Sequence, residues 1–472
     1  MSKAKVETAE QKAKRQAKEQ KELAKWEREK AKPKSKLYFW YLFFVVALIF
    51  VVDEVASTIG THMQAEIAIG LFNDKLSIMS LVGAFSLPMM ALATFYKSLA
   101  DRYGRKLFLC INTLGMGAGL FFVFLAGSIG AMPGMLMYVG AMMVVNFFIP
   151  NDMQVVYLME NAPQNRRATM LSVLKGIGTL GSVLIPLMRS TFMGSDVTKW
   201  YLVYLIPSLI GLFAATFALV TARESDVFLN NRINFLKMTD GERAAEAATR
   251  SKGSQAQGGI GHAFRFAFGH KQLRWLFIAI VIFRIGGMGS AYYPQISNVF
   301  YETADVTTIL FVYSFASAFI TLLNGFVSDK IGRKKTIMLF AFTAFTSFVL
   351  FYAGSYLRWS PILIGCFIGF YVGSFFSATD NLGSIMIGES SPTNLRASIM
   401  SSATVMSMIG GMLAIIIPTI TLFASSDNYA TLGMVCMVVS APVMAIALVI
   451  IITKVGDTKH VELDTVRGDE WD

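Results

Sequence analysis

The stretch KSLADRYGRK at residues 97–106 decides the fold of this chain, because a related stretch, GFVSDKIGRKK, returns at residues 325–335. Asp329 follows Asp101 by 228 residues. A second pair keeps almost the same spacing: ENAPQNRR begins at Glu160 and ESSPTNLR begins 229 residues later at Glu389. Apolar runs long enough to cross a membrane flank each copy. This repetition predicts a duplicated membrane domain.

The composition also indicates a membrane protein. Hydrophobic residues make up 54% of the chain and charged residues 15%, and the mean hydropathy is +0.53. A soluble fold would leave too much of this apolar surface in water. The net charge of +11 does not indicate nucleic-acid binding, because the basic residues lie in the N-terminal tail and in short loops without interleaved aromatic residues.

The sequence predicts no cofactor, metal site or disulfide. The three cysteines lie in apolar runs, where a thiol behaves as a small hydrophobic group, and the four histidines lack the spacing of metal ligands. GIGTLG at 176–181 matches the dinucleotide-binding fingerprint, but it lies inside an apolar helix with no strand before it. No phosphate-binding loop ending in Gly-Lys-Ser/Thr is present, so the chain has no built-in ATP-driven motor.

The predicted fold class is an all-α membrane protein with 12 transmembrane helices in two pseudo-symmetric six-helix bundles. The bundles cover 37–221 and 272–454, with a basic tail at 1–36, a linker at 222–271 and a second tail at 455–472. The predicted spans are 37–62, 77–96, 107–127, 135–157, 169–188, 201–221, 275–297, 306–326, 336–356, 362–387, 398–423 and 432–454.

The distribution of Lys and Arg predicts that both termini are cytoplasmic. Basic residues cluster in the loops after the second, fourth, eighth and tenth spans, whereas the alternate loops hold chiefly Lys75, Lys199 and Arg358. We expect a multi-pass protein of the cell membrane, which is the inner membrane in a Gram-negative bacterium. Its partners are the lipid bilayer and a small-molecule substrate. Nothing in the sequence requires an oligomer, and we expect a monomer.

The first 36 residues carry 13 Lys and Arg against 6 Asp and Glu, and Trp26 is their only large apolar anchor. We interpret this segment as a helix-prone, solvated cytoplasmic tail. Contact with anionic lipid headgroups is the alternative. The polar composition of the linker predicts a flexible tether with one short surface helix near 241–250.

The repeated motifs and the twelve spans resemble the major facilitator superfamily of secondary transporters. The segments at 160–167 and 389–396, with RESDVFL at 223–229, are similar to its sugar-porter and organic-ion-transporter branch. The chain has Arg223 where that branch usually has proline, and IGGM at 285–288 where sugar porters carry a glutamine-rich signature. The resemblance implies a central cavity between the bundles, lined by the first and seventh helices.

The repeated motifs predict a cytoplasmic gate. Glycine permits a tight turn in each copy of the first motif, and the acidic residue at that turn can accept hydrogen bonds from a helix N-terminus. The glutamate of each second motif can pair with nearby arginines. Such pairs would latch the two halves and break when that face opens, while the alternative is that the basic loops only hold the topology. The predicted gate residues are Asp101, Gly104, Arg105, Glu160, Arg167, Asp329, Gly332, Arg333, Glu389 and Arg396.

Ionisable residues within the spans predict the substrate or proton-coupling site, because each costs roughly 2.5–3.5 kcal/mol at the bilayer centre. Asp53 and Glu54 lie in the first span and Arg284 lies in the seventh. Either carboxylate could neutralise Arg284 in an empty cavity until a substrate or proton replaces one partner. A purely structural bridge between Asp53 and Arg284 is the alternative.

Further candidates lie in the fourth, fifth, seventh and tenth spans. Asp152 and Asp380 occupy matched positions in the two halves. Lys175 is either a substrate contact or a side chain that reaches to the membrane surface. In the seventh span, glycines and a proline predict a bending point with Tyr292, Tyr293 and Gln295 facing the cavity, whereas ordinary interface tyrosines are the alternative.

These features predict a secondary active transporter, not an enzyme, that moves a small organic solute by alternating access with H+ as the coupling ion. Arg284 favours an anionic or zwitterionic substrate. Export of a hydrophobic cation handled by Asp53, Glu54 and Asp152, or uptake of a sugar, are alternatives on the same fold. A non-transporting sensor or scaffold is the alternative from a different class.

Overall fold

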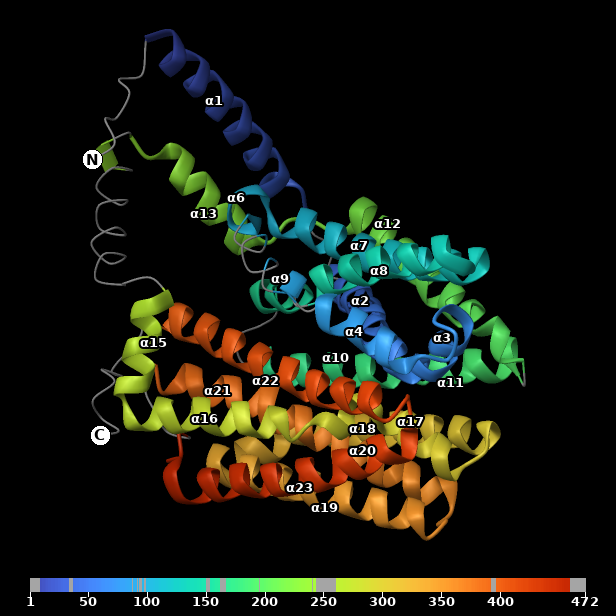
Figure 1. Cartoon of the computed structure of the whole chain (residues 1–472). Helices are drawn as coiled ribbons and strands as arrows, with labels where there is room; N and C mark the ends of the chain where they lie inside the picture. The colour runs from blue at the N-terminus through green and yellow to red at the C-terminus, as the bar shows by residue number, and fades with distance from the viewer. Residues whose placement is uncertain are drawn as a thin grey trace.

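The computed structural model arranges the described part of the chain as a series of helices (Figure 1). It describes residues 9–33, 37–86, 88–90, 92, 96, 99–149, 153–161, 167–194, 196–239, 241–242, 260–391 and 396–458. The first-half elements are α1 (Ala9–Ala31), α2 (Tyr38–His62), α3 (Gln64–Leu71), α4 (Leu76–Ser86), α6 (Ala100–Tyr103), α7 (Arg105–Ile129), α8 (Ala131–Phe148), α9 (Met153–Asn161), α10 (Arg167–Gly181), α11 (Leu184–Met188), η3 (Arg189–Met193), η4 (Val197–Tyr204), α12 (Leu205–Thr221) and α13 (Asp226–Lys237). The second-half elements are α15 (Ile260–Gly269), α16 (Lys271–Ile285), α17 (Met288–Phe300), α18 (Thr303–Ile331), α19 (Arg333–Tyr356), α20 (Pro361–Phe376), η5 (Ser377–Leu382), α21 (Gly383–Glu389), α22 (Arg396–Ala424) and α23 (Tyr429–Lys454).

Within the described residues, ten helices are long and apolar enough to cross a membrane, and an eleventh span results if the bent pair at 64–90 counts as one. That pair turns by 111° between α3 and the helix that begins with α4. The predicted span at 169–188 is interrupted, because a turn at Ser182 and Val183 separates α10 from α11. The chain is therefore a multi-pass helical membrane protein, in which one predicted span is broken and another begins with a sharp bend.

The first- and second-half helices occupy different parts of the molecule (Figure 1). Helices α7, α8 and α12 pack together at the top of the view, and α18, α19, α20 and α23 lie at the bottom. The two halves meet mainly where α10 packs on α18 and where α4 packs on α22. Helices α1, α13 and α15 lie at the left end, which we call the α13 face, and α3 lies toward the opposite end, the far face.

The two tight turns of the repeated motif form as predicted. Gly104 separates α6 from α7 with a φ of +113°, and Gly332 separates α18 from α19 with a φ of +97°. A side chain is strained in this region of backbone conformation, so glycine allows the chain to stop one helix and start the next at once.

Other glycines let helices approach closely. A Cβ on Gly211 in α12 would lie 2.8 Å from the Cα of Gly117 in α7. A Cβ on Gly178 would lie 3.0 Å from the carbonyl oxygen of Phe50, and one on Gly181 would lie 2.6 Å from the side chain of Val51. The GIGTLG segment thus packs α10 closely against α2.

The N-terminal segment differs from the predicted solvated tail. Helix α1 packs against α13, and Trp26 is only 7% exposed beside Phe228, Leu229 and Ile233. The linker also holds two helices, α13 and α15, that the prediction of a flexible tether missed. Of the predicted surface helix at 241–250, residues 243–250 lie outside the described residues.

Candidate functional site

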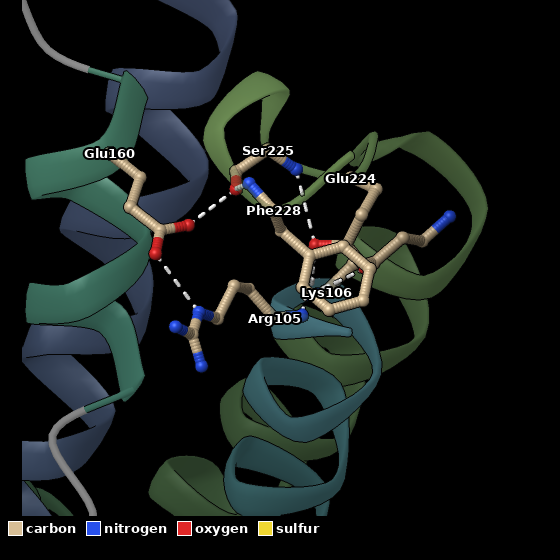
Figure 2. A network of polar contacts seen from close by, with 6 residues as sticks. All are labelled: Arg105, Lys106, Glu160, Glu224, Ser225 and Phe228. Carbon is tan, nitrogen blue, oxygen red and sulfur yellow. Dashed lines mark hydrogen bonds and ion pairs between the residues drawn. The ribbon is translucent and has the colours of Figure 1, made fainter. Parts of the chain in front are cut away.

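The first charged cluster lies at the α13 face of the first half (Figure 2). The guanidinium of Arg105, at the start of α7, donates from Nε to the carboxylate of Glu160 in α9 at 3.0 Å. Both side chains are largely covered, with 17% and 15% of their surface exposed. Two of the predicted gate residues, Arg105 and Glu160, are therefore an ion pair in the structure.

Glu224 completes this cluster by capping helix α7 (Figure 2). Its carboxylate accepts hydrogen bonds from the backbone N–H groups of Arg105 at 2.9 Å and Lys106 at 3.1 Å. A Cβ on Gly104 would lie 2.3 Å from Oε2 of Glu224. Glycine is thus required at position 104 both for the turn and for the close approach of the carboxylate.

Ser225 links the cap to the ion pair (Figure 2). Its hydroxyl donates to the carboxylate of Glu160 and accepts from the backbone N–H of Phe228 at 3.1 Å, which caps α13. Burial raises the pKa of Glu224 above its usual value, although the backbone hydrogen bonds oppose this effect. One network therefore ties together the ends of α7, α9, α12 and α13.

The second half repeats this network. Arg333 donates from Nε to Glu389 at 3.3 Å, and Asp457 accepts from the backbone N–H groups of Arg333 at 3.1 Å and Lys334 at 3.2 Å. The hydroxyl of Thr458 donates to Glu389 as Ser225 does to Glu160. The chain thus repeats an acid and a hydroxyl residue directly after the last helix of each half. The sequence prediction missed this third repeat, although the shared residue types after each apolar run could have revealed it.

The predicted latch between the halves differs from these contacts. The pair of Arg105 with Glu160 and the pair of Arg333 with Glu389 each lie within one half. They tie helix ends together inside a half, because the repeated loop and the glutamate come from the same repeat. The side chains of Asp101, Arg167, Asp329 and Arg396 lie outside the described part of the structure.

A second charged region lies within the spans, and its pairing differs from the prediction. Arg284 in α16 forms an ion pair with Asp380 in η5, not with Asp53 or Glu54. The rings of Phe375 and Phe376 lie 5.8 and 5.4 Å from the guanidinium carbon. Both charges of this pair come from the second half, so Arg284 is neutralised without a carboxylate from the first helix.

The first half contributes further polar groups within the spans. Asp53 in α2 accepts a hydrogen bond from Nε2 of Gln154 in α9 at 3.1 Å. Lys175 in α10 donates to Oδ1 of Asn381 in η5 at 2.9 Å and interacts electrostatically with Glu54. The hydrogen bond from Lys175 joins the two halves, so this side chain does not simply extend to the membrane surface. Asp152 lies outside the described residues.

The seventh predicted span is interrupted by a turn at its glycines, Gly286 and Gly287. Helix α16 ends at Ile285 and α17 begins at Met288. Tyr292 and Tyr293 are 1% and 2% exposed, so neither is an ordinary tyrosine of the membrane interface. Gln295 donates from Nε2 to Oε1 of Gln64 in α3 at 3.0 Å, which joins the halves near the far face instead of at the level of Arg284.

A third cluster, which the sequence prediction did not include, lies near the far face of the first half. Arg189 in η3 pairs with Glu66 in α3 at 2.5 Å, and their side chains are 2% and 5% exposed. His62 lies beside them, with its ring 5.9 Å from Tyr293 and 5.3 Å from Tyr313 of the second half. This buried pair connects the bend at α3 to the interrupted fifth span.

Comparison with known proteins defines the family. The sequence model of the Major Facilitator Superfamily matches residues 39–415 and 294–467. The chain belongs to this family. A comparison with curated proteins found no match.

Solved structures share the fold at low sequence identity. A D-xylose-proton symporter is 15% identical with a TM-score of 0.64, covering 89% of this chain and 99% of that one. An inward-open structure of the xylose transporter XylE from E. coli has the same identity and TM-score and covers 91% and 99%. The fucose:proton symporter FucP from E. coli is 11% identical with a TM-score of 0.55, covering 89% and 99%.

Proposed function

We propose that this protein is a secondary active transporter that moves a small organic solute across the cell membrane by alternating access, coupled to protons. We assign six helices to each half, at 37–221 and 272–454, with both termini in the cytoplasm and the α13 face on the cytoplasmic side. The protein acts as a monomer. Family membership and the shared fold support the class of activity, and the positions of Lys and Arg in the loops support the orientation.

The observation that carries this proposal is the hydrogen bond from Lys175 to Asn381 at 2.9 Å, which joins the two halves within the spans. An ionisable side chain within a membrane span costs free energy, so it normally has a function or a partner. Here an amide oxygen, which a substrate group can replace, is the partner of the ammonium. A solute bound at this position would contact both halves and so bias their relative movement.

The charges near this position favour a zwitterionic or anionic solute. Lys175 and Arg284 supply cations, while Asp53, Glu54 and Asp380 supply carboxylates. Because Asp380 already neutralises Arg284, Lys175 is the better contact for a substrate carboxylate. Asp53 and Glu54 then remain as the groups that receive the coupling proton.

Sugar–proton symport is the second candidate, because the similar structures include a D-xylose-proton symporter and a fucose:proton symporter. In that function, Gln154, Asn381 and neighbouring amides would serve as hydrogen-bonding groups for hydroxyls. A sugar would depend less on Lys175 than an anion would, since a hydroxyl gains less from an ammonium than a carboxylate does.

A ligand-dependent thermal shift of the purified protein distinguishes these functions. The panel contains amino acids, organic anions, organic cations and sugars, with Lys175→Met and Arg284→Ala tested beside the wild type. Arg358→Ala is the matched control, because Arg358 lies in a turn between α19 and α20, outside the spans. Stabilisation by zwitterions or anions that disappears in Lys175→Met supports the proposal.

Uptake into proteoliposomes with and without a proton gradient then tests transport itself. Uptake of the stabilising solute should rise with the gradient and fall in Asp53→Asn. A solute that stabilises the protein but is never transported would favour the alternative of a membrane sensor on this fold.

A further inference from the structure

Asp427 caps a helix that belongs to the other half of the protein. Its Oδ1 accepts a hydrogen bond from the backbone N–H of Ser77 at 2.6 Å, and its Oδ2 accepts from the hydroxyl of Ser77 at 3.0 Å. Ser77 lies in the first turn of α4 in the first half, and Asp427 lies between α22 and α23 in the second half. Helix α22 therefore ends where α4 begins.

The turn after α22 holds this carboxylate in place. Ser426 and Asp427 have φ angles of 54° and 63°, and the backbone N–H of Asp427 donates to the carbonyl of Leu422 at 2.8 Å. The next residue, Asn428, caps α23 by accepting from the N–H groups of Ala430 and Thr431 at 2.9 and 3.1 Å. Two consecutive side chains thus cap two helices, one in their own half and one across the boundary between the halves.

A helix N-terminus carries unpaired N–H groups and a partial positive charge, so a carboxylate beside it is stabilising. When the carboxylate belongs to the same half as the helix, this stabilisation is present in every conformation of a rocking transporter. The cap by Asp427 differs, because it exists only while the end of α22 touches the start of α4. Separating the two halves at this face must break both hydrogen bonds.

Other contacts close the boundary between the two halves near this cap. Gln64 and Gln295 join the halves at 3.0 Å, and His62 contacts the rings of Tyr293 and Tyr313. Ser80, one turn after Ser77, is 2% exposed. The far face is thus closed around the start of α4 in this structure.

We propose that Asp427 and Ser77 form the lock that holds the far face closed and that must break at each opening. The inference rests on the proposed alternating-access function. Helices α4 and α22 pack on one another across the halves, so a lock at this end holds together two helices that must separate as the far face opens.

Cysteine accessibility tests the lock without a known substrate. Ser80→Cys is introduced after Cys110, Cys366 and Cys436 are replaced by alanine, and a membrane-impermeant maleimide is applied from the far side. We expect Asp427→Ala to raise the labelling rate about tenfold, which corresponds to about 1.4 kcal/mol. Asp427→Asn should have a smaller effect, since the amide oxygen still accepts from the backbone N–H. Ser77→Ala should have the smallest effect, because that N–H remains.

Asp196→Ala is the matched control. Asp196 also caps a helix with its carboxylate, but it accepts from Thr198 within its own half. Its removal should leave the labelling of Ser80→Cys unchanged. Equal labelling rates in Asp427→Ala and Asp196→Ala would overturn the lock.

Folding and function are checked separately. If Asp427→Ala does not purify as a folded protein, Asp427→Asn decides the test, and a wild-type labelling rate in that folded variant contradicts the lock. If labelling rises as expected but no solute in the panel is bound or transported, the lock stands and the proposed transport function fails.

Discussion

The indole ring of Trp26 meets the ring of Phe228 edge to face, with the two centroids 5.4 Å apart. Arg232 on α13 pairs with Glu22 on α1 at 2.8 Å, and Lys237 pairs with Glu27 at 2.8 Å. The N-terminal segment is thus a docked helix. After the end of α1, the carbonyl of Lys32 accepts a hydrogen bond from Arg223 at 3.2 Å. Arg223 directly precedes Glu224 and Ser225, which connect α13 to the charged cluster at the start of α7.

We predict that Trp26→Ala releases α1 from α13. A buried tryptophan contributes about 3 kcal/mol or more relative to alanine, so docking should be lost while the membrane helices stay folded. Hydrogen exchange should become faster in α1 and α13 only. Trp40→Ala is the control, since Trp40 is 65% exposed and its loss should leave the exchange of α1 unchanged.

Docking of α1 should also depend on pH through Glu22. Burial raises the pKa of Glu22, but hydrogen bonds from Arg232 and Trp26 and the charge of Arg232 outweigh it, so the pKa lies below its usual value of 4.5. A lowered pKa in the docked state means that the stabilisation is present above pH 4.5 and is lost as the pH falls further. Exchange of α1 should therefore accelerate in acid, and Glu22→Gln should remove most of this dependence. Acceleration of equal size in Glu22→Gln would contradict the assignment.

Gly104→Ala should destabilise the first half. The positive φ alone costs about 1–3 kcal/mol with a side chain, and the added Cβ would also displace the carboxylate of Glu224 from the N-terminus of α7. Thermal unfolding measures this loss. The control is Gly140→Ala in α8, where a Cβ meets no atom within 4 Å, and this change should be neutral or slightly stabilising.

Removing one partner of the Arg284 and Asp380 pair should be worse than removing both. Either single alanine variant leaves a charge within the membrane without its partner, whereas the double variant leaves none. A double-mutant cycle of thermal stability should give a coupling energy of about 1 kcal/mol or more. Additive losses would show that the two side chains do not depend on each other.

Much of the fold could be predicted from local patterns. Apolar runs located the helices, and Gly104 and Gly332 located the two sharp turns, because hydropathy and backbone conformation depend on nearby residues. The broken span at Ser182 was missed, since the apolar run continues through it. The segment at 63–76 was left between two predicted spans, and the helix α3 within it and its sharp turn into α4 come from the structure alone. The gate prediction expected the glutamates to pair with nearby arginines across the halves, whereas the pairs in the structure lie within one half.

The sequence by itself determined the class of protein, the duplication and the positions of the repeated turns, because these follow from composition and from spacing along the chain. Only the tertiary structure decided the partners: Asp380 for Arg284, Asn381 for Lys175, and Asp427 for Ser77. Partners of this kind depend on how each helix is rotated about its axis and on which helix ends meet. Packing between distant segments sets both properties, and hydropathy along the chain does not encode them.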